Sequence, residues 1–265
     1  FNWMSFSRKF VEGFDLSYQE MTDQCVSYAV EAHLFSVIAN ILTQILKMAE
    51  DFHDFTSSLA DFFVKKPKEG VIGSTAMPHK TGNPWNTEGA LKMLAKSIEL
   101  LHFYSKELQL YKHEGDMGRS SMLRNVGDVF MDIFIGINRF STDMTNFLPA
   151  PKNINAFIDR HPSMVVSSIY MAILKRERIE GDAYRLIQNL AFDHGEDTIE
   201  YLGAIELTLR KLNLSQELIE EMLSYLEPKN ATGKAAYLAN KHTQLMRLNI
   251  RKYREMAQTI KIFPI

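Results

Sequence analysis

The sequence has little cysteine, little proline or glycine, and no excess of charge of either sign. The single cysteine, Cys25, excludes a disulfide within the chain and fits a reducing cytoplasm, where we expect it to be a small buried hydrophobic residue. The 30 basic and 32 acidic residues leave a formal net charge of −2. No overall field therefore attracts nucleic acid or an anionic membrane, and we expect neither as a partner.

Long uninterrupted apolar runs are also missing. No segment approaches the ~20 consecutive apolar residues that span a bilayer. The first four residues, Phe-Asn-Trp-Met, lack the basic and then apolar pattern of a signal peptide. Because the chain starts without an initiator Met and in the middle of a pattern, we expect it to be a fragment of a longer protein.

The sparse glycines and prolines indicate where helices lie. Neither residue occurs between Gly13 and Pro67, and apolar residues recur there at helical spacing from Leu34 to Phe63. This pattern predicts a helix within 24–64 of ~35 to 40 residues, about 55 Å long. The usual globular helix has ~11 residues, so such a length predicts a long bundle or an oligomer core.

Two further long helices are predicted, over 89–115 and 120–147. Within the second of them, Gly127 and Gly136 lower helix stability or allow a neighbouring helix to approach closely. Shorter helices follow from about residue 154, and no strand alternation exceeds four residues. The sequence therefore predicts an all-α fold, with a long-helix bundle over 1–150 and a smaller C-terminal helical domain over 151–265.

The segment 70–88 connects two of the long helices and is rich in glycine, proline and small hydroxyl residues. Backbone N–H groups at Gly73 and Ser74 can form an anion-binding nest, and the helix that begins near Pro84 directs its positive end back toward it. Helix connections in bundles usually have ~2 to 8 residues. The greater length predicts a lid or a binding loop.

The same loop resembles a known signature. Residues 73–88 read Gly-Ser-Thr-Ala-Met-Pro-His-Lys-Thr-Gly-Asn-Pro-Trp-Asn-Thr-Glu. They are similar to the fumarase and aspartase superfamily pattern Gly-Ser-Ser-x-Met-Pro-x-Lys-x-Asn with a later Glu, and Met-Pro-His-Lys is typical of adenylosuccinate lyases. Two positions depart from the pattern: Thr75 replaces its second Ser, and Gly82 is an extra residue. The residues that match are Ser74, Met77, Pro78, Lys80, Asn83 and Glu88.

The resemblance covers nearly the whole chain and points to the C-terminal part of a bacterial-type adenylosuccinate lyase. Residues 16–35 resemble the stretch that carries a substrate-binding Gln, matched here by Gln24. Residues 120–127 resemble Ser-Thr-Val-Leu-Arg-Asn-Leu-Gly, whose Ser and Arg bind the substrate phosphate and correspond to Ser120 and Arg124. Residues 228–235 resemble Pro-Ala-Asn-Tyr-Ile-Gly-Arg-Ala.

The resemblance implies β-elimination of fumarate from adenylosuccinate and from the succinocarboxamide ribotide, two purine nucleotide substrates, without a metal or another cofactor. Such a reaction needs a base, an acid and fixed donors around a developing carbanion. The implied catalytic residues are Ser74 as the base, Lys80, and Glu88, which orients an acid histidine located in the N-terminal half of relatives. The implied substrate-binding residues are Gln24, Thr75, Met77, Asn83, Ser120 and Arg124.

One departure affects the implied substrate site. The family has a substrate-contacting Arg where this chain has Gly115, and Arg119 is the candidate that replaces it; the alternative is a solvated residue at a helix start. The histidines present do not supply the acid, because His79 is expected to support the loop, and His33, His53 and His102 to be packing or surface residues. No residue spacing indicates a metal site.

The superfamily implies a homotetramer whose active sites each draw residues from three subunits. Two alternatives to adenylosuccinate lyase remain at this point. One is another lyase of the superfamily, acting on argininosuccinate, fumarate or aspartate, which Ser120 and Arg124 disfavour because those substrates carry no phosphate. The other is a non-catalytic helical oligomerisation module, which Gly82 and Gly115 favour.

Overall fold

The computed structural model describes residues 1–21, 27–57, 60–66, 82–110, 112, 118–178, 181–195, 198–212 and 214–259. The chain divides into two compact units, Phe1–Ala150 and Pro151–Ile265. Helices dominate both units, and the strands found among these described residues are two segments of three residues each. The prediction of an all-α fold is confirmed.

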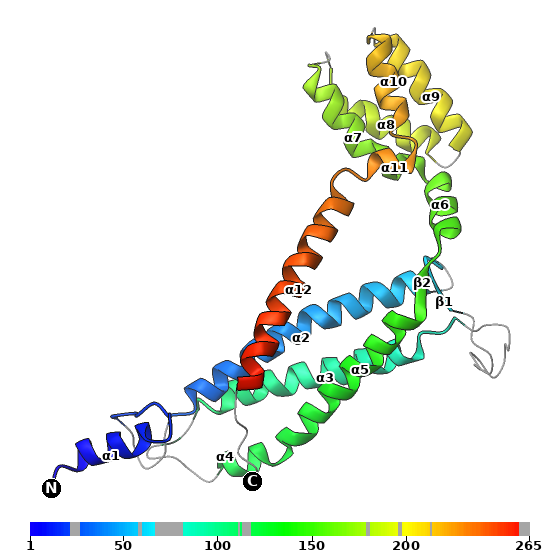
Figure 1. The fold of residues 1–265 in the computed structure, drawn as a ribbon. Helices are drawn as coiled ribbons and strands as arrows, with labels where there is room; N and C mark the ends of the chain where they lie inside the picture. Colours follow the sequence, from blue (N-terminus) through cyan, green and yellow to red (C-terminus); the bar gives the residue numbers. More distant parts are fainter. Residues whose placement is uncertain are drawn as a thin grey trace. The chain divides into compact units, whose positions relative to one another are not determined.

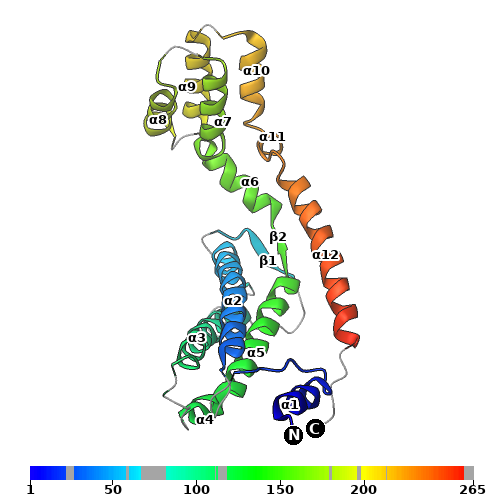
Figure 2. The same cartoon turned by 90° about the vertical axis from the view of Figure 1, so that its left-hand side faces the viewer.

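Three long helices form the body of the first unit and lie side by side in both ribbon views (Figures 1 and 2). They are α2 (Ala29–Thr56), α3 (Trp85–Glu107) and α5 (Val126–Asn146). The shorter elements of this unit are α1 (Trp3–Glu12), β1 (Phe63–Lys65), α4 (Gly118–Met122), the 3₁₀ turn η1 (Leu123–Asn125) and β2 (Phe147–Pro149).

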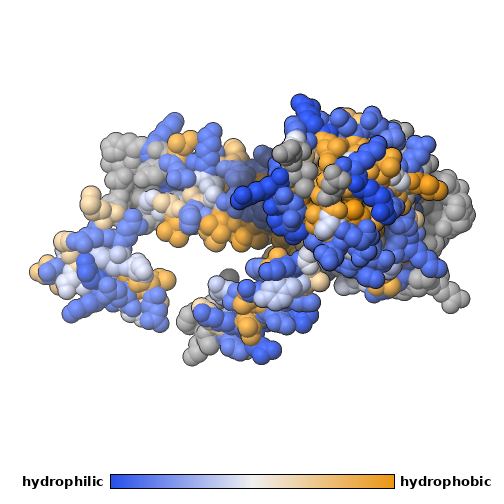
Figure 3. Space-filling view, turned by 90° about the horizontal axis from the view of Figure 1, so that it is seen from above, coloured by the Kyte–Doolittle hydropathy of each residue, from blue (hydrophilic) through white to orange (hydrophobic). Residues whose placement is uncertain are grey.

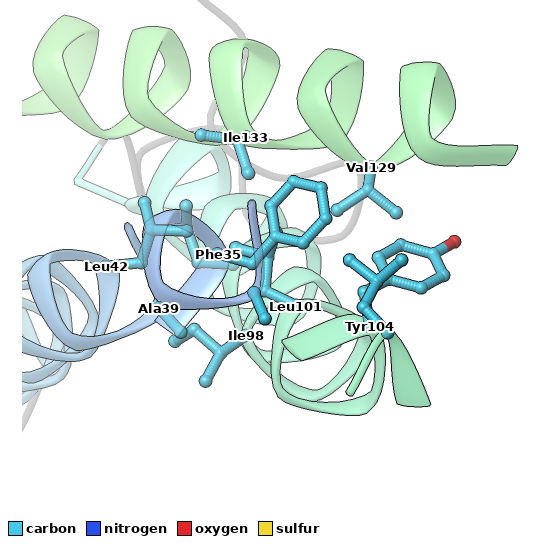
Figure 4. Close-up of a cluster of buried hydrophobic side chains, with 11 residues drawn as sticks. Phe35, Ala39, Leu42, Ile98, Leu101, Tyr104, Val129 and Ile133 are labelled. Atoms are coloured by element: carbon cyan, nitrogen blue, oxygen red, sulfur yellow. The ribbon is translucent and has the colours of Figure 1, made fainter. Parts of the chain in front are cut away.

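The core between the three long helices follows from their apolar spacing. Side chains three or four residues apart form one buried stripe on each helix, as expected for a period of 3.6. Figure 4 shows these stripes meeting. At Gly136 on α5, an added Cβ would lie 3.1 Å from Cδ2 of Leu94 on α3, so the missing side chain allows the two helices to approach closely. The stripes include Phe35, Ala39 and Leu42 on α2, Ile98, Leu101 and Tyr104 on α3, and Val129 and Ile133 on α5.

The long helices are shorter than the sequence predicts. The first ends at Thr56, whose hydroxyl donates to the backbone carbonyls of Phe52 and His53. The chain then enters β1 instead of continuing to residue 64. The second helix spans Trp85–Glu107 instead of 89–115, and the third is interrupted by η1 before α5 begins.

Strands β1 and β2 pair in antiparallel fashion, with Phe63 opposite Pro149 and Lys65 opposite Phe147. A second small core lies beside them, where Phe52 makes edge-on ring contacts with Phe140 and Phe147. We call this part of the first unit the strand end. It comprises the C-terminal turns of α2 and α5, the first turn of α3, and the two strands.

The second unit is built from shorter helices around a core of its own. Tyr170, one of its two fully buried tyrosines, donates a hydrogen bond of 2.8 Å to the backbone carbonyl of Met222. Burial raises the pKa of the Tyr170 hydroxyl well above its ordinary value of 10.0. The helices are α6 (Pro151–Arg160), α7 (Pro162–Arg176), α8 (Ala183–His194), α9 (Thr198–Lys211), α10 (Gln216–Ser224), α11 (Pro228–Ala231) and α12 (Ala235–Thr259).

The face of α2 that points away from the core is apolar as well. Its exposed side chains recur at helical spacing, and they are Val30, Leu34, Val37, Ile41, Met48 and Phe55. By length and composition alone, α2 is long and apolar enough to cross a membrane. The core helix of a soluble bundle meets the same two criteria. One face of α2 is buried against α3 and α5. On the face seen in Figure 3, hydrophobic areas lie between hydrophilic ones.

Candidate active site

The residues of the predicted site that the structure describes form two groups, both in the first unit. The first group is at the strand end, where Asn83 and Pro84 lead into α3 and Glu88 lies in its first turn. Asn83 is half-buried, Pro84 is buried and Glu88 is exposed. A carboxylate in the first turn of a helix is stabilised by the partial positive charge of the helix N-terminus.

A buried carboxylate from α5 anchors this turn. Oδ2 of Asp143 accepts a hydrogen bond of 2.8 Å from the backbone N–H of Thr87 and one of 2.9 Å from the Thr87 hydroxyl. Oδ1 of Asp143 accepts a third bond of 3.1 Å from the Asn86 side chain. Asp143 and Thr87 are fully buried, so both are held firmly. This network fixes the residue that directly precedes Glu88.

Arg139, one turn before Asp143 on α5, holds the same part of α3. Its guanidinium donates to the backbone carbonyl of Trp85 at 3.3 Å and lies 5.4 Å from the centre of the Trp85 ring. The close contact depends on Gly89, because a Cβ at that position would lie 2.4 Å from the guanidinium carbon of Arg139. A side chain at residue 89 would therefore displace the arginine.

Glu88 has a histidine beside it. Nε2 of His53, at the end of α2, is 3.8 Å from Oε1 of Glu88, and Nδ1 of His53 is 3.9 Å from Oδ1 of Asp54. Both His53 and Glu88 are partly exposed. The prediction of His53 as a packing or surface residue is compatible with this position, and the structure adds that it faces the carboxylate of the signature.

The second group surrounds the start of α5, and we call it the α4 end. Ser120 and Arg124 are exposed, on α4 and η1 respectively. Arg119 is different, because it is buried and its guanidinium lies 4.6 Å from the centre of the Tyr28 ring, in a cation–π contact. Arg119 is therefore not the solvated residue at a helix start that was the alternative to its substrate-binding role.

Within one chain the two groups are far apart. Asp143 contacts the first turn of α3, whereas Arg124, nineteen residues earlier in the sequence, lies in η1 two residues before α5 begins. At 1.5 Å per residue this separation is about 28 Å. Figure 1 shows the start of α3 beside the strands and α4 at the opposite end of the bundle. The structure therefore does not bring Glu88 and Arg124 of one chain into one site.

Five of the predicted site residues lie outside the described residues: Gln24, Ser74, Thr75, Met77 and Lys80. The described residues contain no group of three His, Cys, Asp or Glu side chains able to hold a metal ion. In the second unit, Lys229 and Asn230 from the segment 228–235 line an open cavity of ≈ 760 Å³.

Sequence reasoning missed Asp143 and Arg139. Both lie more than fifty residues from their partners in α3, and no local pattern links such distant positions. A signal was nevertheless present, since Asp143 is a charged residue on the apolar face of an otherwise amphipathic helix. A carboxylate in such a position needs hydrogen-bond donors from another element.

The structure matches the crystal structure of 3-carboxy-cis,cis-muconate lactonizing enzyme from Pseudomonas putida with a TM-score of 0.60. The match has 17% sequence identity and covers 93% of this chain and 54% of that one. The chain therefore shares the fold of that enzyme.

The sequence is similar to adenylosuccinate lyases. It is 25% identical to that of Buchnera aphidicola subsp. Schizaphis graminum over 89% of this chain, and 28% identical to that of Dictyostelium discoideum over 88%. These matches confirm the resemblance that the motifs indicate. The chain spans about half the length of these relatives, 50% and 49%. No protein-family model matches it.

Proposed function

We propose that the protein is an adenylosuccinate lyase that acts in the cytoplasm in purine nucleotide biosynthesis. It would release fumarate from adenylosuccinate and from the succinocarboxamide ribotide. One observation carries the proposal: similarity to adenylosuccinate lyases over nearly nine-tenths of the chain includes both the signature loop and the segment with Ser120 and Arg124.

The phosphate group distinguishes these substrates from those of other lyases in the superfamily. Ser120 and Arg124 are exposed at the α4 end, where an anion can reach them. An arginine binds phosphate through two parallel charged hydrogen bonds, which are about twice as strong as neutral ones. Argininosuccinate, fumarate and aspartate carry no phosphate for this arginine to bind.

The proposed chemistry removes a proton from the carbon next to a succinyl carboxylate. Ser74 takes this proton, the carbon–nitrogen bond breaks as the double bond of fumarate forms, and an acid returns a proton to the departing nitrogen. Serine is a weak base, so it needs the nearby Lys80 and the N–H groups of the loop to stabilise its deprotonated form. Lys80 and Asn83 hold the succinyl carboxylates, and Glu88 orients the acid histidine.

The same geometry supports self-association. Because Glu88 lies beside the Asp143 contact and Arg124 lies about 28 Å away along α5, a site that uses both would take them from different copies. The exposed apolar stripe of α2 is long enough to pack against such copies and supports a homotetramer with shared sites. A membrane or a nucleic acid has no role in this proposal.

The experiment is a substrate comparison on the protein as its organism makes it. Fumarate release should occur with adenylosuccinate and the succinocarboxamide ribotide, and should be absent with argininosuccinate and aspartate. Release from argininosuccinate alone would assign the protein to another lyase of the superfamily. A folded protein inactive on all four substrates would favour the non-catalytic module.

A further inference from the structure

We propose that Asp143 is a positioning residue for the active site, because it anchors the turn of α3 from which Glu88 projects. This role rests on the proposed function, since it concerns the residue that would orient the acid. Asp143 does not contact substrate in this proposal. It acts through Thr87 and Asn86, which form the start of the same helix.

The first turn of α3 needs such an anchor. A helix leaves its first N–H groups without partners inside the helix, and a Ser, Thr, Asp or Asn before the first turn usually accepts from them. Pro84 occupies that place in α3, and its side chain makes no capping hydrogen bond. Asp143 supplies the acceptor from another helix through its 2.8 Å bond to the Thr87 N–H.

The burial of the network makes it rigid. Asp143 and Thr87 are both 0% exposed, and the Asp143 carboxylate has three donors. A buried carboxylate with satisfied hydrogen bonds tolerates little movement of its partners, because losing any of them leaves a charge poorly compensated. Arg139 holds Trp85, the first residue of α3, by donating to its backbone carbonyl. Two side chains of α5 thus set the direction in which Glu88 leaves α3.

Position matters for the proposed reaction, because a displacement of ~1 Å in a catalytic group costs about a hundredfold in rate. Asp143→Asn keeps the shape and removes the charge, and Asp143→Ala removes the acceptor altogether. We expect kcat to fall about tenfold in the first variant and about a hundredfold in the second, with KM changed less than about threefold.

The control is Ser97→Ala on the same helix. The Ser97 side chain is buried, and its hydroxyl donates a hydrogen bond of 2.9 Å to the Met93 carbonyl, so the variant removes a buried side-chain hydrogen bond of α3 away from the first turn. We expect this variant to keep the wild-type kcat. A second readout needs no substrate: hydrogen exchange of the Thr87 and Glu88 amides should accelerate in Asp143→Ala and stay slow in Ser97→Ala.

The outcomes separate the two proposals. An active wild type whose Asp143 variants keep full kcat would overturn the positioning role and leave the lyase assignment intact. Amide exchange unchanged in Asp143→Ala would overturn the anchoring itself. A wild type without lyase activity would overturn the proposed function and the positioning role together, even if the exchange result showed the anchor.

Discussion

The two glycines of α5 allow the packing of the bundle to be tested with one chemical change at two positions. Gly136 is buried, and an added Cβ would lie 3.1 Å from Cδ2 and 3.2 Å from Cγ of Leu94. Gly127 is exposed in the first turn, with no atom within 4 Å of an added Cβ. Replacing either glycine by alanine adds helix propensity, worth up to about 1 kcal/mol.

At Gly136 the same methyl group also overpacks the interface, which costs about 1 to 3 kcal/mol. We therefore expect Gly127→Ala to stabilise the first unit by up to about 1 kcal/mol, and Gly136→Ala to destabilise it by about 0 to 2 kcal/mol. Urea unfolding followed by tryptophan fluorescence measures this unit alone, because both tryptophans, Trp3 and Trp85, belong to it.

The clash partner gives an internal check. Leu94→Ala leaves a cavity and should cost about 2 to 5 kcal/mol by itself. The double variant Leu94→Ala, Gly136→Ala should lose less than the sum of the two single changes, since the added methyl group enters the vacated space. If Gly136→Ala proves as stabilising as Gly127→Ala, the close approach of α3 and α5 at this glycine is refuted.

The remaining predictions concern catalysis and pH. Ser74→Ala should lower kcat at least ~10²-fold with binding nearly intact, and weakened binding at unchanged kcat would leave Ser74 as only an anion-nest residue. Arg124→Ala should raise KM about ten- to a hundredfold, the equivalent of a lost charged hydrogen bond, and an unchanged KM would remove Arg124 from the phosphate site. Arg119→Ala should impair catalysis, and adding Gly115→Arg should partly rescue that variant. Wild-type kinetics in Arg119→Ala would show that Arg119 does not replace the family arginine missing at position 115. Because the folded-state pKa of Tyr170 is raised, the unfolded chain loses that proton first, so stability should fall above pH 10.0 and fall less in Tyr170→Phe.

The fold is largely predictable from the sequence because helical periodicity is a local signal. The apolar spacing on α2, α3 and α5 gives both the existence of the long helices and the faces that they bury. The ends of these helices depend on other contacts. Thr56 turns its hydroxyl onto the last carbonyls of α2, and β1 pairs with β2 more than eighty residues along the chain. Neither feature has a signature in a single sequence.

The site is predictable only in part, for the same reason. The motifs identify Asn83, Glu88 and Arg124, because a motif is a pattern in the order of residues along the chain. The supporting residues come from other elements: Asp143 reaches α3 from α5, and Arg119 is buried against Tyr28 before the start of α2. Such contacts become visible once the helices have been packed together.

The central claim is that the active site combines residues from different copies of the chain, and subunit mixing tests it most directly. Ser74→Ala and Arg124→Ala proteins would be co-expressed in equal amounts, and fumarate release would be measured at adenylosuccinate concentrations far below the wild-type KM, where each parent alone has little activity. If the two residues of one site come from different copies, random assembly should restore about a quarter of the wild-type activity. A mixture no more active than its parents would show that each site takes both residues from one chain, and would contradict the account.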